Sequence, residues 1–178
     1  MLLAIISDTH MPRGDRALPD ACVRRLREAD LILHAGDVFA PEVLDMLEAI
    51  GPPLLGVHGN VDVPEVRARL PWRRVVEAGG ARIGMVHDGG PAGGRLMRLR
   101  EEFPDVDAVV FGHSHLPLHE RDPGGRFQIF NPGSPTERRR APVHTMGLAR
   151  IAAAGAVSFE LVELPPAPVP RRGPAPAR

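Results

Sequence analysis

The hydrophobic residues in the first third of this 178-residue chain fall into short runs separated by amphipathic stretches. Leu2–Ser7 is a continuous apolar run, which is typical of a strand buried on both faces. Similar runs at 31–35 and 54–58 predict two more strands, and the apolar spacing at 17–29 and 41–50 predicts a helix before each of them. Alternating strands and helices predict a parallel sheet, at which ligands gather beyond the carboxyl ends of the strands.

From about Trp72 the pattern changes to paired strands. Three hairpins are predicted, each from two runs that flank a turn signal: 73–78 with 82–87, 116–121 with 126–130, and 145–152 with 156–164. Between them, 92–103 is predicted to be a helix and 108–111 a buried strand. We therefore expect an α/β protein in which two sheets pack together with helices outside.

Composition narrows the class of protein. Hydrophobic residues make up 43% of the chain and charged residues 25%, as in a soluble globular protein. The 22 basic and 22 acidic residues give a net charge of zero, so no global field attracts nucleic acid or a membrane surface. We expect neither as a partner. A phosphate-bearing substrate would have to be held locally, by metals or by a few arginines.

The ends of the chain and its single cysteine suggest a compartment. Cys22 has no second cysteine to pair with, which favours a reducing environment. The apolar start is shorter than a signal peptide and lacks its basic region, so we expect a cytoplasmic protein. A domain is predicted over 1–164, and the Pro-, Ala- and Arg-rich segment 165–178 is predicted to be a disordered tail.

Residues of metal-ligand type follow the predicted strands. They are Asp8, His10, Asp37, Asn60, His87, His113 and His115. In D-x-H and H-x-H, alternate residues of an extended segment would share a face. Gly36, Gly59 and Gly112 each precede one of these residues, where a glycine permits a sharp turn and close approach. Carboxylate, amide and imidazole ligands suit manganese, iron, cobalt, nickel or zinc.

The order D-x-H, G-D, G-N, H, G-H-x-H resembles the signature of the calcineurin-like metallophosphoesterases, from Asp8 to about Pro142. The short length, GNVD at 59–62 and NPGS at 131–134 resemble the small YfcE-like branch, to which the eukaryotic retromer scaffold subunit also looks related. This resemblance implies a four-layer α/β/β/α sandwich, with two mixed β-sheets flanked by helices. It also implies a phosphodiesterase that uses two divalent metal ions, with manganese first and nickel, iron, cobalt or zinc as alternatives.

The resemblance also implies a role for each ligand-type residue. The first metal would be bound by Asp8, His10, Asp37 and His115. The second metal would be bound by Asp37, Asn60, His87 and His113, so that Asp37 bridges the ions. A hydroxide shared by the two ions would be the nucleophile. The candidate catalytic residues are Asp37, Asn60 and Asp62.

Two positions depart from the wider family pattern. Many relatives carry a histidine after G-N that can protonate the leaving oxygen, but here the position is Val61. Slow turnover of poor leaving groups is expected as a result. The second histidine of the family's H-G-H segment is also missing, and Asp88 is the residue that could partly replace it. Asp62 either positions its neighbours or shuttles a proton.

Other polar residues have ordinary structural interpretations. His34 and His58 are predicted to be hydrogen-bonded core or supporting residues, and His119 and His144 surface or loop residues. Asn131 is predicted to shape the NPG turn. For two further features the alternatives stay open: Arg13 and the run 138–140 could contact phosphate or be solvated.

Three functions remain in competition. The first is a phosphodiesterase for small or nucleotide-like diesters, and the second is a phosphomonoesterase at the same site. The third is a scaffold that keeps the fold for protein contacts, against which the complete ligand set argues. The sequence leaves the oligomeric state open, a homo-oligomer included.

Overall fold

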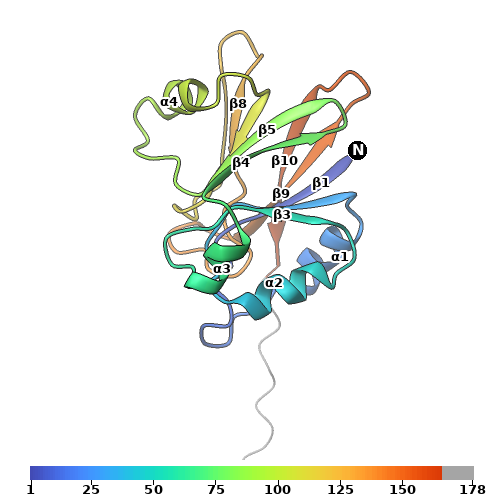
Figure 1. The fold of residues 1–178 in the computed structure, drawn as a ribbon, viewed down its shortest axis with the longest axis vertical. Coiled ribbons are helices and arrows are strands. Elements are labelled where there is room, and N and C mark those ends of the chain that lie inside the picture. The colour runs from blue at the N-terminus through green and yellow to red at the C-terminus, as the bar shows by residue number, and fades with distance from the viewer. Residues whose placement is uncertain (166–178) are drawn as a thin grey trace, which may run out of the picture.

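The structure is a computed structural model that describes residues 1–165. The predicted tail beyond Pro165 lies outside the described residues. Two five-stranded sheets face each other (Figure 1). The first has the order β10-β9-β1-β2-β3, from the strands β1 (Leu2–Ile6), β2 (Leu31–His34), β3 (Leu54–Gly56), β9 (His144–Ile151) and β10 (Val157–Leu164). The second has the order β4-β5-β6-β8-β7, from β4 (Arg73–Ala78), β5 (Ala81–Val86), β6 (Ala108–Val110), β7 (Leu118–Arg121) and β8 (Gln128–Asn131).

Both sheets are mixed, and helices cover their outer faces (Figure 1). In the first sheet β1, β2 and β3 are parallel, and in the second β5, β6 and β8 are parallel. The helices α1 (Asp20–Arg27), α2 (Pro41–Glu48) and α3 (Pro64–Arg69) lie on the first sheet, and α4 (Arg95–Glu102) lies on the second. The predicted four-layer α/β/β/α sandwich is confirmed.

Strand β1 shows why the layers form. Its alternate side chains enter different cores: Ala4 and Ile6 pack with the helices α1 to α3, whereas Leu3 and Ile5 pack against the second sheet. All four are fully buried. Burying such a side chain contributes roughly 1.5–3 kcal/mol, so a strand that is apolar at every position is held from both sides.

The structure differs from the predicted elements in two places and completes them in a third. Helix α1 begins at Asp20 rather than at residue 17, because Pro19 stands at its N-cap position. Helix α3 was not predicted, since its six residues bury only Val66 and carry no apolar period. The last predicted hairpin, β9 with β10, is not assigned to a sheet by its sequence, and it joins the first sheet beside β1.

The described helices are all short. None of those found in residues 1–165 has the length and apolar character that crossing a bilayer requires.

Candidate metal centre

Loops from both sheets meet at one place and carry all seven predicted ligands. The loops after β1, β2 and β3 supply Asp8 and His10, Asp37, and Asn60. The loops after β5 and β6 supply His87, then His113 and His115. Because parallel neighbours end at the same edge of a sheet, residues far apart in the chain converge there.

The first cluster consists of Asp8, His10 and His115, and all three are buried. The Nε2 atoms of His10 and His115 lie 3.1 Å apart. The Nε2 atom of His115 also lies 3.3 Å from Oδ1 of Asp8. Three potential ligand atoms therefore surround one point in the interior.

The second cluster consists of Asp37, His87 and His113. Oδ2 of Asp37 lies 3.2 Å from Nε2 of His87. Asn60 adds a neutral oxygen, because its Oδ1 lies 3.2 Å from Nε2 of His87 and 3.0 Å from Nδ1 of His113. The cluster thus offers two oxygens and two ring nitrogens.

Asp37 lies between the two clusters. Its Oδ2 atom, already close to His87, is 3.5 Å from Nε2 of His10. Its other oxygen, Oδ1, accepts a hydrogen bond of 3.1 Å from the backbone N–H of Val61. One carboxylate oxygen is therefore within reach of both clusters, and the other fixes the direction of the carboxylate.

The chemistry of the second donor set fits a cation. Nδ1 of His87 lies 2.8 Å from the carbonyl oxygen of Ala35, which can only accept, so this nitrogen carries the proton in the neutral ring. The lone pair on Nε2 then faces the oxygens of Asp37 and Asn60. Lone pairs that converge in this way repel one another until a cation lies between them.

His115 repeats this arrangement in the first cluster. Its Nδ1 atom donates to the carbonyl oxygen of Glu137, which leaves Nε2 as the acceptor facing His10 and Asp8. A backbone carbonyl bound to the far nitrogen of a histidine is the usual way in which proteins orient a metal-binding imidazole. Both donor sets therefore fit divalent metal ions.

Glu137 is a part of the site that sequence reasoning missed. Besides its carbonyl, its carboxylate contributes: Oε2 lies 3.7 Å from Nε2 of His10, and Oε1 accepts a hydrogen bond of 2.8 Å from Arg16. Glu137 directly precedes the arginine run 138–140, whose side chains are exposed. The contact that orients His115 is a backbone carbonyl, which any residue supplies, so the sequence carries no signal for it.

The backbone explanation for D-x-H and H-x-H was wrong. Instead of extended segments, the structure places five of the ligand residues in the left-handed region, with positive φ angles at Asp8, His10, Asp37, His113 and His115. This region is unfavourable for residues other than glycine. Hydrogen bonds hold the backbone in this conformation. The Asp8 carboxylate accepts one from the His113 N–H, and the Asp8 carbonyl accepts one from Ser134 Oγ.

The glycines beside the ligands are required by close packing, as the sequence suggested. A Cβ atom at Gly59 would lie 2.0 Å from Oδ1 of Asp37, and one at Gly112 would lie 1.9 Å from Oγ of Ser7. Neither distance is sterically allowed. A larger residue at either position would displace a ligand loop.

Burial and mutual charge shift the pKa values of the predicted ligands. Burial raises the pKa of the Asp8 carboxyl to about 7. Burial opposes the charged form of Asp37 and His87 as well, but their hydrogen bond outweighs it, which lowers the pKa of Asp37 to about 2 and raises that of His87 to about 9. A cation at the second cluster would take the place of the proton on Nε2 of His87 and leave that ring neutral. Burial lowers the pKa of His115 to about 4, which keeps this ring neutral and able to act as a ligand.

Asp62 is buried and lies beside the ligands rather than among them. Its Oδ1 accepts a hydrogen bond of 2.5 Å from the N–H of Phe39, and its Oδ2 accepts one of 2.6 Å from the N–H of Gly59. Phe39 lies two residues after Asp37, and Gly59 directly precedes Asn60. Asp62 therefore ties together the loops that carry these two ligands.

The remaining polar residues of the site take supporting positions. His34 is fully buried and bonds the Thr9 hydroxyl and the Gly36 N–H, as expected for a core histidine. Asn131 shapes its turn by accepting from the Gly133 N–H, and its amide also donates to the Gly112 carbonyl. His119 is exposed on β7, as predicted for a surface residue.

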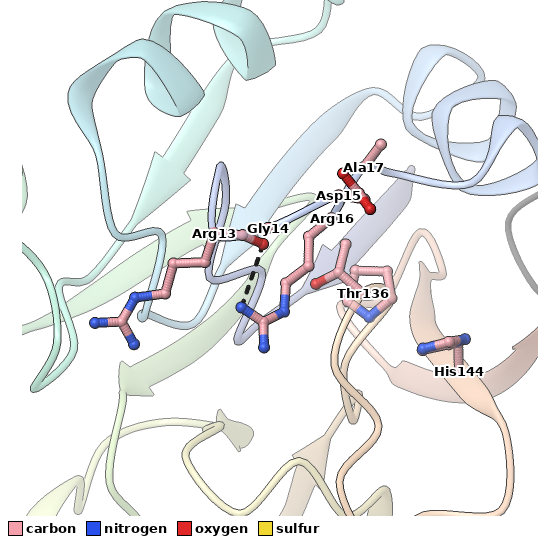
Figure 2. A pocket seen from close by; sticks show the side chains of 8 residues that line it. Arg13, Gly14, Asp15, Arg16, Ala17, Thr136 and His144 are labelled. Carbon is pink, nitrogen blue, oxygen red and sulfur yellow. Dashed lines mark hydrogen bonds between the residues drawn. The ribbon is translucent and has the colours of Figure 1, made fainter. Parts of the chain in front are cut away.

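A pocket of about 390 Å³ is lined by residues 13–17 together with Pro135, Thr136 and His144, as Figure 2 shows. Arg13, Arg16, Thr136 and His144 lie around it, and the dashed line marks the hydrogen bond from Arg16 to the Arg13 carbonyl. The guanidinium of Arg13 lies 4.4 Å from the centre of the Phe39 ring. None of the seven predicted ligands lines this pocket.

Comparison with solved structures supports the same architecture. Vps29 from Entamoeba histolytica, in complex with zinc, aligns with a TM-score of 0.72 and 24% identity over 92% of this chain and 99% of that protein. An archaeal phosphodiesterase aligns with a TM-score of 0.69 and 16% identity over 91% of this chain and 100% of that protein. At these identities the likeness is one of fold.

Sequence comparison is more specific. A probable metallophosphoesterase of Methanocaldococcus jannaschii is 36% identical over 144 residues, which cover 78% of this chain and 70% of the relative. A second probable metallophosphoesterase, from Methanothermobacter thermautotrophicus, is 34% identical over 142 residues, which cover 78% of this chain and 80% of the relative. Residues 1–154 match the calcineurin-like phosphoesterase superfamily domain. The chain belongs to the calcineurin-like phosphoesterase superfamily.

Proposed function

We propose that this protein is a dinuclear, divalent metal-dependent phosphodiesterase that hydrolyses small or nucleotide-like diesters. The observation that carries the proposal is the position of Asp37, whose Oδ2 lies 3.5 Å from a ligand atom of the first cluster and 3.2 Å from one of the second. A carboxylate oxygen within reach of both clusters can bridge two neighbouring cations and hold them at the spacing of a two-metal site. Manganese is the metal that we propose first.

Two bound divalent ions would supply an activated water and a clamp for the phosphate oxygens. Around them, the residues of the chain orient and balance charge. Asp37 holds both clusters in register, with its second oxygen fixed by the Val61 N–H. Asn60 contributes an oxygen without adding negative charge, and it is exposed, so an anionic substrate can approach from its side.

The charges near the clusters favour a diester over a monoester. A phosphodiester carries one negative charge, whereas a monoester carries nearly two at neutral pH. Glu137 places a further carboxylate 3.7 Å from His10, and Arg16 is paired with it. A second arginine, Arg139, is exposed and lies with its guanidinium 3.5 Å from the His113 carbonyl. One arginine at this side matches the single charge of a diester better than the two charges of a monoester.

The position after Asn60 leaves the leaving group without an obvious proton donor. Val61 cannot donate a proton from its side chain. Asp62, the other candidate, has both carboxylate oxygens occupied by backbone N–H groups, so we propose that it positions the loops and does not shuttle protons. The leaving oxygen must then depart largely as an anion, which restricts fast turnover to good leaving groups.

The test combines metal analysis with paired substrates. After loading with each of the five candidate metals, elemental analysis should give two ions per chain. Bis(p-nitrophenyl) phosphate should then be cleaved with a higher kcat/KM than p-nitrophenyl phosphate, and chelation should abolish both activities. A matched control is His119→Ala, which removes an exposed histidine away from the clusters and should change neither result.

Each alternative function predicts a different outcome. Faster cleavage of the monoester would replace the phosphodiesterase with a phosphomonoesterase at the same site. A folded protein that binds no metal and cleaves neither ester would instead support a protein-interaction scaffold.

A further inference from the structure

A second pocket, of about 380 Å³, opens directly at the second cluster. Two of the residues that line it, Asn60 and His87, are predicted ligands, and another is Trp72. The indole of Trp72 is 55% exposed, although the chain has a single Trp, no Tyr and only 4% aromatic residues. An exposed tryptophan beside a reaction centre is unusual in a protein that otherwise buries its few aromatic rings, and it indicates a contact surface.

Two contacts restrain Trp72 and the segment that carries it. The segment joins α3 to β4 (Figure 1), and in it the Pro71 carbonyl accepts a hydrogen bond of 3.0 Å from the His58 N–H. The guanidinium of Arg73 lies 4.8 Å from the centre of the indole ring, and Arg73 is not among the residues that line the pocket. The guanidinium over one face restrains the ring, which reduces the conformational entropy lost when a second ring stacks on the other face.

The charged groups of the pocket nearly cancel. Arg67 contributes a positive charge, but its guanidinium is bonded to the backbone carbonyls of Asp62 and Asn60, both at 2.9 Å. Asp88 contributes an exposed negative charge. His58 and the predicted ligand His87 also line the pocket. Because the guanidinium of Arg67 is already bonded to two carbonyls, the side of the pocket away from His87 is suited to an uncharged group rather than to a second phosphate.

We propose that this pocket receives a nucleobase of the substrate, stacked on Trp72, while the phosphate lies at Asn60 and His87. The inference rests on the proposed function for its place in the reaction and makes nucleoside-bearing diesters the substrate class. Every base presents a π-face, so stacking selects bases in general and does not distinguish one from another. Trp72 is then a specificity-determining residue for the ester group.

The single tryptophan provides a direct test that does not depend on turnover. The full chain, loaded with Zn²⁺, is titrated with adenosine 5′-monophosphate and, in parallel, with ribose 5-phosphate. Fluorescence is excited at the red edge of indole absorption, where adenine does not absorb. The nucleotide should quench the emission of Trp72 saturably, and the sugar phosphate, which lacks the base, should not. Equal effects of both probes, or no effect of either, would overturn the inference.

A kinetic test uses two diesters with the same leaving group. They are thymidine 5′-p-nitrophenyl phosphate and methyl p-nitrophenyl phosphate. Trp72→Ala should lower the ratio of kcat/KM for the thymidine diester to kcat/KM for the methyl diester by about ten-fold or more. Loss of an aromatic stacking partner typically weakens the binding of one base by about this factor. Trp72→Phe should keep most of the ratio. Met97→Ala, which removes an exposed apolar side chain on α4, should keep all of it.

The two tests separate this inference from the proposed function. An unchanged ratio in Trp72→Ala would refute base stacking while leaving the phosphodiesterase intact. If the wild type cleaved neither diester, the proposed function would fail, and the fluorescence titration would still decide whether the pocket binds a base.

Discussion

Replacing Asp62 should weaken the fold and the second metal site together. Asp62→Ala removes the acceptor of two backbone N–H groups, of which that of Gly59 is buried and that of Phe39 partly buried. An unsatisfied buried N–H costs about 1–3 kcal/mol, and a partly buried one costs less because water can reach it. We therefore expect a loss of about 2–4 kcal/mol in the free energy of unfolding. Asp62→Asn should lose about half of this, because its amide keeps one acceptor but turns a donor toward the other N–H.

Urea unfolding of the metal-free protein, followed by circular dichroism, measures this loss. The midpoint should fall by about 1–2 M urea in Asp62→Ala, at the slopes typical of small proteins. Calorimetric titration should show weaker binding of the second ion, because the Asn60 loop is no longer tied to the loop of Asp37. The control is Glu65→Ala, which removes an exposed negative charge from α3.

A role for Asp62 in proton transfer would give a different result. If Asp62→Ala unfolded at the wild-type urea concentration and bound both metals normally but lost turnover, Asp62 would act in proton transfer rather than in positioning. Its two backbone hydrogen bonds would then be incidental to its role.

Four further outcomes are expected. Asp37→Ala should lower metal content at both sites, whereas His10→Ala should lower it mainly at the first; elemental analysis decides, and two retained ions in Asp37→Ala would rule out the bridge. Gly59→Ala should lose metal without altering a ligand, because its Cβ would lie 2.0 Å from Oδ1 of Asp37; Gly93→Ala, with no atom within 4 Å of the new Cβ, is the control, and equal metal content in both would contradict the packing argument. Val61→His should raise turnover of alkyl esters more than that of nitrophenyl esters, and a parallel change in both would show that the leaving group is already protonated elsewhere. Burial lowers the pKa of His34 from 6.5 to about 3, so His34 takes up a proton on unfolding below pH 6.5. Protonation of the unfolded state should therefore lower the free energy of unfolding by about 2 kcal/mol between pH 7 and about pH 5. In urea titrations of the metal-free protein, His34→Gln should lose about 2 kcal/mol less stability than the wild type over this range, and an equal loss in both would contradict the argument.

The layered fold could be predicted because its strands carry a strong local pattern. Strand β1 is apolar at every position and buried on both faces, which a run of this kind indicates directly. Helix α3 has no such pattern, because it is short and packs only Val66 into the core. The placement of β9 and β10 beside β1 depends on pairing between distant segments, which no local pattern encodes.

The members of the candidate site could be predicted better than its geometry. Ligand residue types at the ends of strands pointed to Asp8, Asp37 and the histidines, and the structure brings them together. The role of Glu137 could not be seen, because its carbonyl rather than its side chain orients His115, and any residue supplies a carbonyl. A backbone contact of this kind leaves no mark on the sequence.

The left-handed ligand residues show how the rest of the fold serves the site. Such conformations cost about 1–3 kcal/mol each and persist only where the surroundings hold them. Here the holding groups are not ligands: Ser134 bonds the Asp8 carbonyl, and Asp62 joins the loops of Asp37 and Asn60. Because these bonds join protein groups alone, they lower the ordering entropy that metal binding would otherwise have to offset. The NPGS and GNVD segments therefore support the candidate metal site energetically, although they supply only one predicted ligand, Asn60.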